Sequence, residues 1–468
     1  MAFLLVSCML LSGCAAGAPF MEKEENGTEF TMETLGLEPD FSYVREPEKP
    51  GIQVDRLGYL PGSSKMAVFQ GTELPESFQV VAKDSGECVY QGEIRIRGNA
   101  SDGVFTGYGS FTELREEGSY YIKCDKIGCS YYFDVKKDVY LEKSREYGSI
   151  IEEMQNTEGI QETVDICEAL SCLLAAYEMY PELLTKLWSA GNTVGEEEGA
   201  DAGEFFRMLR QKTDVLLSLQ DERTGGIYTN TGVLQAMGEE GQEAEREMSE
   251  EAAAAFAGTM AKYGYLYQEY DWDYANICLK AAAKTWRYLD RAQQGGGVLE
   301  ERVATGKIYA ASELYRASNE RLYHNYILQN QELVVSRKTD LYLLMGKVTY
   351  LSTKRSVDHE LCSQIMSELM LEAEKTAANQ KTGLFYVEDE EADAVMWDMT
   401  ALALANYAVM NHEYATVIEN HLHYLFGRNA EGVFLIEEPE GKEAARVLLL
   451  LSLVEAERKI IEEAETEL

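Results

Sequence analysis

Basic residues are scarce in this chain of 468 residues. Lys and Arg number 42 against 81 Asp and Glu, which gives a formal net charge of −39 at pH 7. A surface this negative repels phosphate backbones and anionic lipid headgroups, so we do not expect the protein to bind nucleic acid. A neutral ligand meets no such repulsion, and solubility alone is the alternative explanation of the acidity.

The common signatures of metal sites and nucleophilic catalysis are missing as well. The sequence has no CxxC pair, no phosphate-binding loop and no Ser/His/Asp arrangement. Its histidines show no metal-ligand spacing, and the closest two are two positions apart, which places them on different sides of a helix. The five histidines are His324, His359, His412, His421 and His423. The sequence therefore predicts neither a metal site nor a cofactor.

The number of cysteines does not allow a complete disulfide framework. Apart from the two cysteines of the first fourteen residues, seven remain, and an odd number cannot pair fully. Cys124 and Cys129 flank what the pattern indicates is a β-hairpin, where a cross-strand bridge is geometrically possible. Two independent buried thiols fit the sequence equally well.

The N-terminus carries the longest apolar run, and it is too short to span a bilayer. Residues 1–14, MAFLLVSCMLLSGC, are typical of an export signal, although no Lys or Arg precedes the run. The ending Leu11-Ser12-Gly13-Cys14 resembles the bacterial lipobox. That resemblance implies cleavage before Cys14, a lipid on its thiol, and attachment to the outer face of a bacterial cell membrane. An ordinary secretory signal or a buried N-terminal strand is the alternative.

The next segment, residues 15–50, is polar and rich in turn-forming residues, which is typical of a flexible tether. Residues 51–138 then change to short β-prone runs separated by Gly, Pro, Ser or Asp about every ten residues. This spacing predicts an all-β, immunoglobulin-like sandwich.

Residues 139–468 have helical periodicity throughout. Short connections between the helices favour antiparallel neighbours, and small residues from Ala252 to Ala261 would let another helix approach closely. Twelve helices in hairpin pairs would close an (α/α)6 barrel, but periodicity equally allows an irregular bundle. The predicted helices are 143–155, 160–180, 201–220, 247–270, 271–291, 306–317, 321–335, 338–350, 355–380, 393–411, 412–427 and 442–465.

Several stretches resemble glycoside hydrolase family 9, the inverting cellulase family. IQVDRLGYLP at 52–61 and GSYYI at 118–122 are similar to the immunoglobulin-like domain that precedes many of its catalytic domains. Within the helices, the similar stretches are LLAAYEMYP at 173–181, LLSLQ at 216–220, GGIY at 225–228, YAASELYRA at 309–317 and YLFGRN at 424–429. The resemblance implies an (α/α)6 domain that acts on β-1,4-glucan. It is also the sole reason to consider a calcium ion, which is common in that family.

The catalytic residues of that family are only partly matched. Inverting hydrolysis needs one carboxylate to activate water and one protonated carboxyl to release the sugar. The family's Asp-Ala-Gly-Asp motif is absent, and its last position falls near Glu158. The general acid corresponds to Glu443, but Lys442 and Arg446 beside it would favour its ionised form. Carboxylates on a solvated helix face are the alternative for both.

Aromatic side chains stack on the C–H faces of sugars, and three stand at suggestive places. Tyr309 corresponds to a stacking Trp of the resembled family, and Tyr228 and Trp397 are further candidates. Packing in the core is the alternative. We therefore expect a lipid-anchored protein of the family 9 type that acts on β-glucan or related oligosaccharides, with catalysis impaired. A non-catalytic carbohydrate-binding protein and a protein-interaction scaffold are the alternatives.

Overall fold

The structure is a computed structural model of the chain. It describes residues 50–99, 103–154, 160–188, 203–234, 247–294, 300–336, 340–379, 387 and 391–466. The predicted signal with Cys14 and the predicted tether up to residue 49 lie outside the described residues.

The N-terminal domain is made of short antiparallel strands in two sheets. The first sheet has the order β1-β2-β6-β5, and the second has the order β4-β3-β7-β8, with β9 also paired to β7. The strands are β1 (Ile52–Gln53), β2 (Met66–Gly71), β3 (Ser77–Ala82), β4 (Cys88–Glu93), β5 (Arg95–Asn99), β6 (Phe105–Ser110), β7 (Gly118–Cys124), β8 (Gly128–Cys129) and β9 (Phe133–Val135).

Aromatic side chains fill the space between these sheets. Tyr59 meets Phe111 and Phe133 edge to face, with ring centroids 5.4 Å apart in each pair. Cys124 and Cys129 are both free thiols, because Cys124 is paired with Gly128 and Cys129 with Lys123 across the hairpin. The hairpin predicted here is confirmed, and in this structure its thiols are separate.

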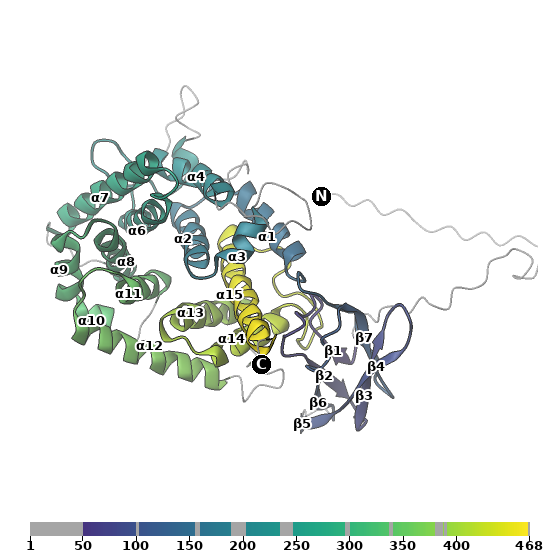
Figure 1. The fold of residues 1–468 in the computed structure, drawn as a ribbon. Helices are drawn as coiled ribbons and strands as arrows, with labels where there is room; N and C mark the ends of the chain where they lie inside the picture. The colour runs from purple at the N-terminus through teal and green to yellow at the C-terminus, as the bar shows by residue number, and fades with distance from the viewer. Residues whose placement is uncertain are drawn as a thin grey trace, which may run out of the picture. The chain divides into compact units, whose positions relative to one another are not determined.

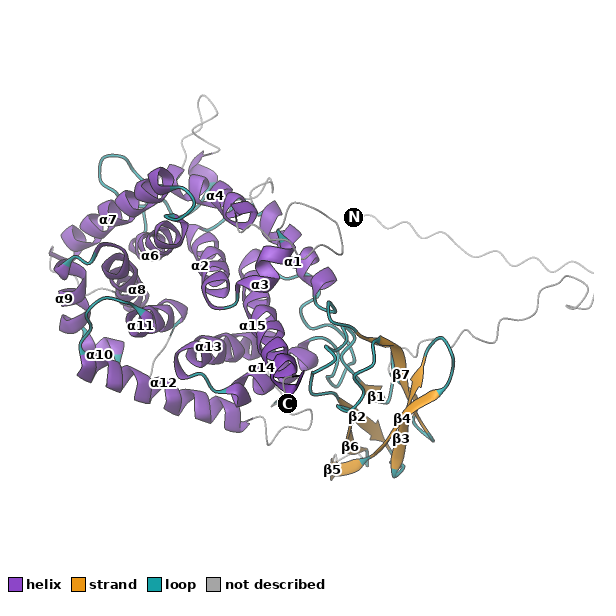
Figure 2. Cartoon of the chain, in the orientation of Figure 1, coloured by secondary structure: helices purple, strands orange, loops and turns teal. Residues whose placement is uncertain are grey.

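Among the described residues, six helices form a closed inner ring in the second domain (Figure 2). Each packs against the next along the chain, and the last packs against the first. They are α2 (Thr163–Met179), α6 (Glu250–Tyr267), α8 (Glu301–Ser318), α11 (Leu341–Ser352), α13 (Ala392–Val409) and α15 (Gly441–Thr466). These helices carry apolar residues on most sides, as expected of helices that are covered all round.

The remaining described helices lie outside the ring (Figure 1). They are α1 (Leu141–Glu153), α3 (Pro181–Leu187), α4 (Gly203–Ser218), α7 (Trp272–Gln294), α9 (Arg321–Gln329), α10 (Gln331–Val334), α12 (His359–Asn379) and α14 (His412–Leu425). Alternating inner and outer helices make an (α/α)6 barrel rather than an irregular bundle, so the predicted fold class is confirmed.

Two local details differ from the sequence prediction. Pro181 ends α2 and begins α3, which was not predicted as a separate helix, because proline lacks the N–H that would continue α2. The predicted helix 321–335 is interrupted at Asn330, whose side-chain amide donates to the Tyr326 carbonyl at 2.8 Å.

Glycines allow three neighbouring inner helices to approach closely. A Cβ on Gly258 of α6 would lie 2.2 Å from the ring of Tyr309 on α8, and one on Gly306 would lie 2.8 Å from Ala254. A Cβ on Gly346 of α11 would meet the Tyr309 backbone at 3.1 Å. The small residues of α6 predicted to permit close packing therefore do so against α8, and Gly346 allows a similar approach of α11 to α8 that was not predicted.

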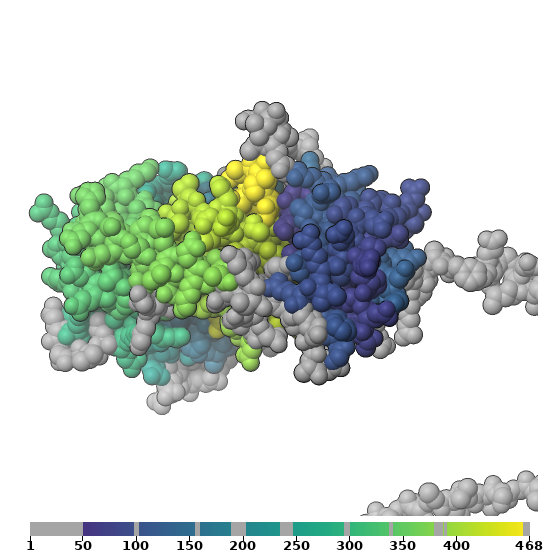
Figure 3. Space-filling model, turned by 90° about the horizontal axis from the view of Figure 1, so that it is seen from below, coloured from purple at the N-terminus to yellow at the C-terminus, as the bar shows by residue number. Residues whose placement is uncertain are grey.

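Residues Pro47–Leu468 form one compact unit, so the sandwich and the barrel are joined by extensive contacts. The sandwich lies beside the C-terminal helices (Figure 3). The Arg56 N–H donates to the Phe426 carbonyl at 2.9 Å, just before Gly427. Gly427 has φ +125°, and a Cβ there would lie 2.8 Å from the Arg56 side chain, so the close contact needs glycine.

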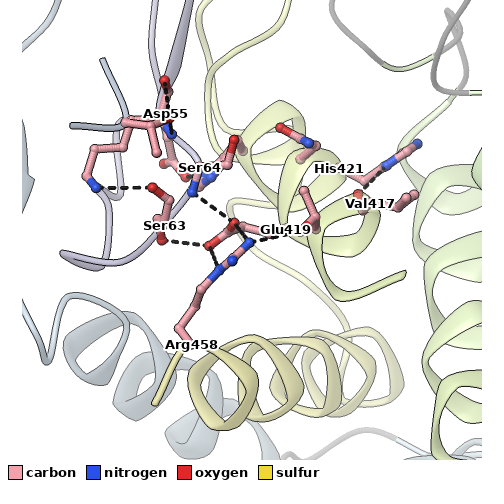
Figure 4. Close-up of polar contacts among 12 residues, drawn as sticks. Asp55, Ser63, Ser64, Val417, Glu419, His421 and Arg458 are labelled. Carbon is pink, nitrogen blue, oxygen red and sulfur yellow. Dashed lines mark hydrogen bonds and ion pairs between the residues drawn. The ribbon is translucent and has the colours of Figure 1, made fainter. Parts of the chain in front are cut away.

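A buried polar cluster completes this interface (Figure 4). Glu419 of α14 accepts hydrogen bonds from the Ser63 hydroxyl at 2.6 Å and from the Ser64 N–H at 3.3 Å, and it pairs with Arg458 of α15. Its carboxylate is fully buried, so these partners replace the water that it loses.

A carboxylate of the sandwich, Asp55, contacts the same helix, α14. Asp55 Oδ2 lies 2.6 Å from Nδ1 of His423, and neither side chain is exposed. Burial raises the pKa of Asp55 well above its usual value, and burial together with the charge of Arg428 lowers the pKa of His423. No local sequence pattern indicates this pair, because its two members are 368 positions apart along the chain.

Candidate functional site

The beginnings of the inner helices meet at one end of the barrel, which we call the N-terminal end of the ring. Lys442 near the start of α15 pairs with Asp165 near the start of α2, at 3.1 Å. Arg302 of α8 pairs with Glu251 of α6 at 2.8 Å, and Thr305 of α8 donates to Asp340, the N-cap of α11. Glu443, one of the two carboxylate candidates from the sequence, belongs to this end of the barrel.

Glu443 lies in the first turn of α15, and its carboxylate caps that helix. Its Oε2 accepts the backbone N–H of Glu440 at 2.9 Å, while the Glu440 carbonyl accepts the N–H of Ala444. The first of these bonds is one half of a helix capping box, in which the third helical residue reaches back to the residue before the helix; the second is the first backbone bond of the helix. The group predicted as general acid therefore has a structural partner within its own helix.

The cations beside Glu443 are held by carboxylates of α2 rather than by Glu443. Lys442 pairs with Asp165, and Arg446 pairs with Glu168. The Arg446–Glu168 pair is largely buried, with 17% and 15% of the two side chains exposed. These two pairs fix the start of α15 against α2 and place two cations next to the proposed acid.

Glu158, predicted near the base position, lies outside the described residues. Within the described ranges, no group of three or more His, Cys, Asp and Glu side chains could hold a metal ion. The calcium ion suggested by the family resemblance thus has no matching set of side chains in this part of the chain.

The three predicted stacking residues differ in their exposure. Tyr309 is fully buried in the ring, where it stacks on Tyr342 at 5.7 Å and its hydroxyl lies 3.2 Å from Ser171 Oγ. Burial raises the pKa of Tyr309 well above its usual value. Core packing, the alternative given for this residue, is the role that the structure assigns to it.

Tyr228 and Trp397 are less deeply placed. Tyr228 is 8% exposed, and its carbonyl accepts the Thr163 hydroxyl at 2.7 Å, which ties its loop to the start of α2. Trp397 of α13 is half-buried, and the guanidinium of Arg446 lies 5.9 Å from its ring centroid. Of the three aromatics, Trp397 is the most exposed, and it lies beside Arg446, which follows Glu443 by three residues on α15.

The opposite end of the ring contains a charged cluster that the sequence analysis missed. Glu178 of α2 pairs with Lys262 of α6 and with Arg316 of α8. Glu313, fully buried, pairs with Arg316 at 2.5 Å and accepts the Thr349 hydroxyl at 2.8 Å. The sequence signal was available, because Glu178, Glu313 and Arg316 are the charged residues within two of the quoted family stretches.

This cluster closes the ring rather than opening a site. A cavity lined by Glu178, Lys262 and Thr349 has a volume of about 10 Å³, which is room for about one water molecule. An oligosaccharide does not fit there. The N-terminal end of the ring remains the candidate site.

Comparisons with known proteins agree with this architecture. Residues 47–129 match the family described as cellulase N-terminal Ig-like domain, and residues 160–436, more than half of the chain, match glycosyl hydrolase family 9. The barrel and the sandwich thus define a protein of the cellulase type. The chain belongs to glycosyl hydrolase family 9 and carries that family's N-terminal Ig-like domain.

Individual relatives have low sequence identity to this chain but align with most of its length. Endoglucanase D of Acetivibrio thermocellus is 22% identical over 451 residues, covering 81% of this chain and 71% of the relative. A family 9 protein of Bacteroides ovatus has a TM-score of 0.68 at 16% identity, covering 87% of this chain and 99% of that one. A metagenome-derived family 9 endoglucanase has a TM-score of 0.69 at 15% identity, with 86% and 98% covered. These structural likenesses establish the fold.

Proposed function

We propose that this family 9 protein binds β-1,4-glucan or related oligosaccharides at the N-terminal end of the ring, and that hydrolysis there is impaired. The family membership supports a β-glucan as the ligand. The single observation that carries the impairment is the engagement of Glu443, whose carboxylate accepts the Glu440 N–H and caps α15. A general acid must instead donate a proton to the leaving sugar.

Trp397 is the proposed contact for the sugar ring. It is half-buried on α13, next to Arg446, whose pair with Glu168 holds the guanidinium in place. An aromatic face supplies stacking, and the neighbouring charged groups supply hydrogen bonds for sugar hydroxyls. The neutral ligand also suits a protein with a net charge of −39.

The test compares binding and turnover in the same purified protein. Calorimetry with cellohexaose should give measurable affinity, and product analysis on cellohexaose and amorphous cellulose should give little or no hydrolysis. Trp397→Ala should weaken binding about tenfold, because it removes the stacking surface. Leu322→Ala, an exposed apolar position on α9, is the matched control and should bind like the unmodified protein.

Glu443→Gln separates the enzyme from the binder. Glutamine keeps an oxygen that accepts the Glu440 N–H, so the helix cap survives the change. Efficient turnover that Glu443→Gln abolishes would show a working hydrolase and contradict impaired catalysis. If the protein shows neither affinity for the glucan nor turnover of it, the scaffold function is the one that remains.

The proposed location is the outer face of a bacterial membrane, with lipid on Cys14. The support is the sequence Leu11-Ser12-Gly13-Cys14 after an apolar run. No helix in the described ranges is long and apolar enough to cross a membrane. Cys14→Ser should move the protein from the membrane fraction to the soluble fraction, and unchanged fractionation would reject the lipid anchor.

A further inference from the structure

Two large aromatic side chains are exposed at the turn between α6 and α7. Tyr270 is 45% exposed and Trp272, the first residue of α7, is 62% exposed. The chain has four tryptophans, and Trp286 on the same helix is only 1% exposed. Exposing an indole forfeits the large apolar area that it could bury, so this position is a candidate binding surface.

Tyr270 is held in place from beneath. Its ring lies 4.9 Å from that of Phe206 and stacks on Tyr267 at 6.0 Å with an interplanar angle of 19°. Its hydroxyl lies 2.9 Å from the hydroxyl of Tyr177. The ring is therefore fixed before any ligand arrives, which lowers the entropic cost of binding.

Polar groups border these aromatics. Arg210 of α4 pairs with Asp271 at 3.1 Å, and its guanidinium lies 4.0 Å from the ring centroid of Tyr274. The Arg210 and Asp271 side chains are 40% and 34% exposed, so both can reach a ligand. A donor and an acceptor beside an aromatic surface match the alternating C–H faces and hydroxyls of a pyranose chain.

We propose that Trp272 and Tyr270 form a second carbohydrate-binding surface that takes a neutral β-glucan chain. This inference rests on the proposed function for the ligand class, and it adds a site separate from the N-terminal end of the ring. Even a whole aromatic side chain buries only about 150–250 Å², and these two are 45% and 62% exposed, so together they offer well below the roughly 800 Å² per partner of a stable protein interface. A flat sugar chain needs no larger surface.

The surface lies at the far end of the barrel. It follows the last residue of α6, whereas Glu251, in the contacts of the N-terminal end of the ring, lies in the first turn of α6. The 18 residues of α6 separate the two places by about 25 Å along the helix. A long glucan chain or a solid glucan surface could occupy this second place without covering the first.

The experiment measures binding of the full chain to cellohexaose and to insoluble cellulose. Trp272→Ala should weaken binding to cellulose about tenfold, and Trp272→Phe, which keeps a stacking ring, should lose much less. The tryptophan emission of the unmodified protein should shift on adding cellohexaose, and Trp272→Phe should lose part of that shift. Leu322→Ala serves as the control for an exposed apolar side chain.

Comparison with Trp397→Ala separates the two proposals. Weaker binding in Trp272→Ala, with an unchanged thermal midpoint, supports the second surface whether or not Trp397→Ala also binds more weakly. Unchanged binding in Trp272→Ala with weaker binding in Trp397→Ala overturns the second surface and leaves the proposed function standing. Absence of glucan binding by the unmodified protein rejects both. A change in sedimentation with unchanged glucan binding would assign Trp272 to contacts between copies and overturn the inference.

Discussion

Glu178 shows how a single side chain connects three helices of the ring. Burial alone would raise the pKa of this carboxyl, but Lys262 and Arg316 lower it to about 2, from an ordinary value of 4.5. The folded state thus favours the ionised form, and the associated stability is complete above pH 4.5. It is lost as the pH falls from 4.5 towards 2.

We predict that Glu178→Gln removes this pH dependence. At pH 7 the variant should unfold about 3 kcal/mol more easily, because a pKa shift of this size corresponds to about that free energy. The difference from the unmodified protein should shrink below pH 4.5. Urea unfolding at a series of pH values measures it.

The control for this measurement is an exposed carboxylate. Glu182→Gln affects a surface pair with Lys459, in which about half of each side chain is exposed, and it should change stability by less than about 1 kcal/mol. An equal loss of stability at pH 3 and pH 7 in Glu178→Gln would contradict the assignment.

At the scale of elements, the approach of α6 to α8 depends on Gly258. A Cβ there would lie 2.2 Å from the ring of Tyr309, which is itself enclosed by Tyr342. Helix propensity favours alanine over glycine by about 1 kcal/mol, but the clash opposes that gain. The net effect of Gly258→Ala should be a loss of about 1–3 kcal/mol.

A double-mutant cycle identifies the cause of that loss. Tyr309→Ala removes the ring and should itself cost about 3–5 kcal/mol through the cavity that it leaves. In that background Gly258→Ala should no longer destabilise, because the Cβ meets open space. Equal losses in both backgrounds, measured by urea unfolding, would show that Tyr309 is not the obstacle.

The helices of the ring show how much of the fold could be predicted from the sequence. Helical periodicity and the family stretches located most of the helices but missed α3, and the closed ring follows once α15 packs on α2. The quoted similarity placed Tyr309 at a sugar-facing position, whereas the structure buries it in the ring. Local spacing cannot distinguish these roles, because both require an aromatic residue on the inner face of α8.

The candidate site was harder to predict for a physical reason. The position of Glu443 near the start of a helix was readable, but its hydrogen bond to the Glu440 N–H depends on the exact first residue of α15. The exposed fraction of the Trp272 side chain depends on which residues pack around it, and those residues come from distant segments of the chain. Contacts such as Asp55–His423 join residues 368 positions apart, beyond the reach of any local pattern.

At the scale of the whole molecule, Glu419 links the sandwich to the barrel. Its carboxylate joins Ser63 of the N-terminal domain to Arg458 of α15, all in a buried setting. Glu419→Ala leaves Arg458 without this partner and should cost about 3–5 kcal/mol. Differential scanning calorimetry should show a lower midpoint for the unfolding of both domains.

Glu182→Ala is the matched control for this change, since it also removes an ion pair of α15, at an exposed position. It should leave the midpoint within about 2–4 °C of the unmodified protein. A lower midpoint for one domain, with the other unchanged, would mean that the two domains unfold independently and that Glu419 does not couple them.

The length of α15 affects how the two domains are coupled. It bears Glu443 in its first turn and Arg458 fifteen residues later, a rise of about 22 Å. The helix thus forms a rigid connection between the sandwich and the place where sugar is proposed to bind. Deleting the sandwich would leave one end of α15 without its packing partner. We therefore expect weaker ligand binding, even though no residue of the sandwich need touch the sugar.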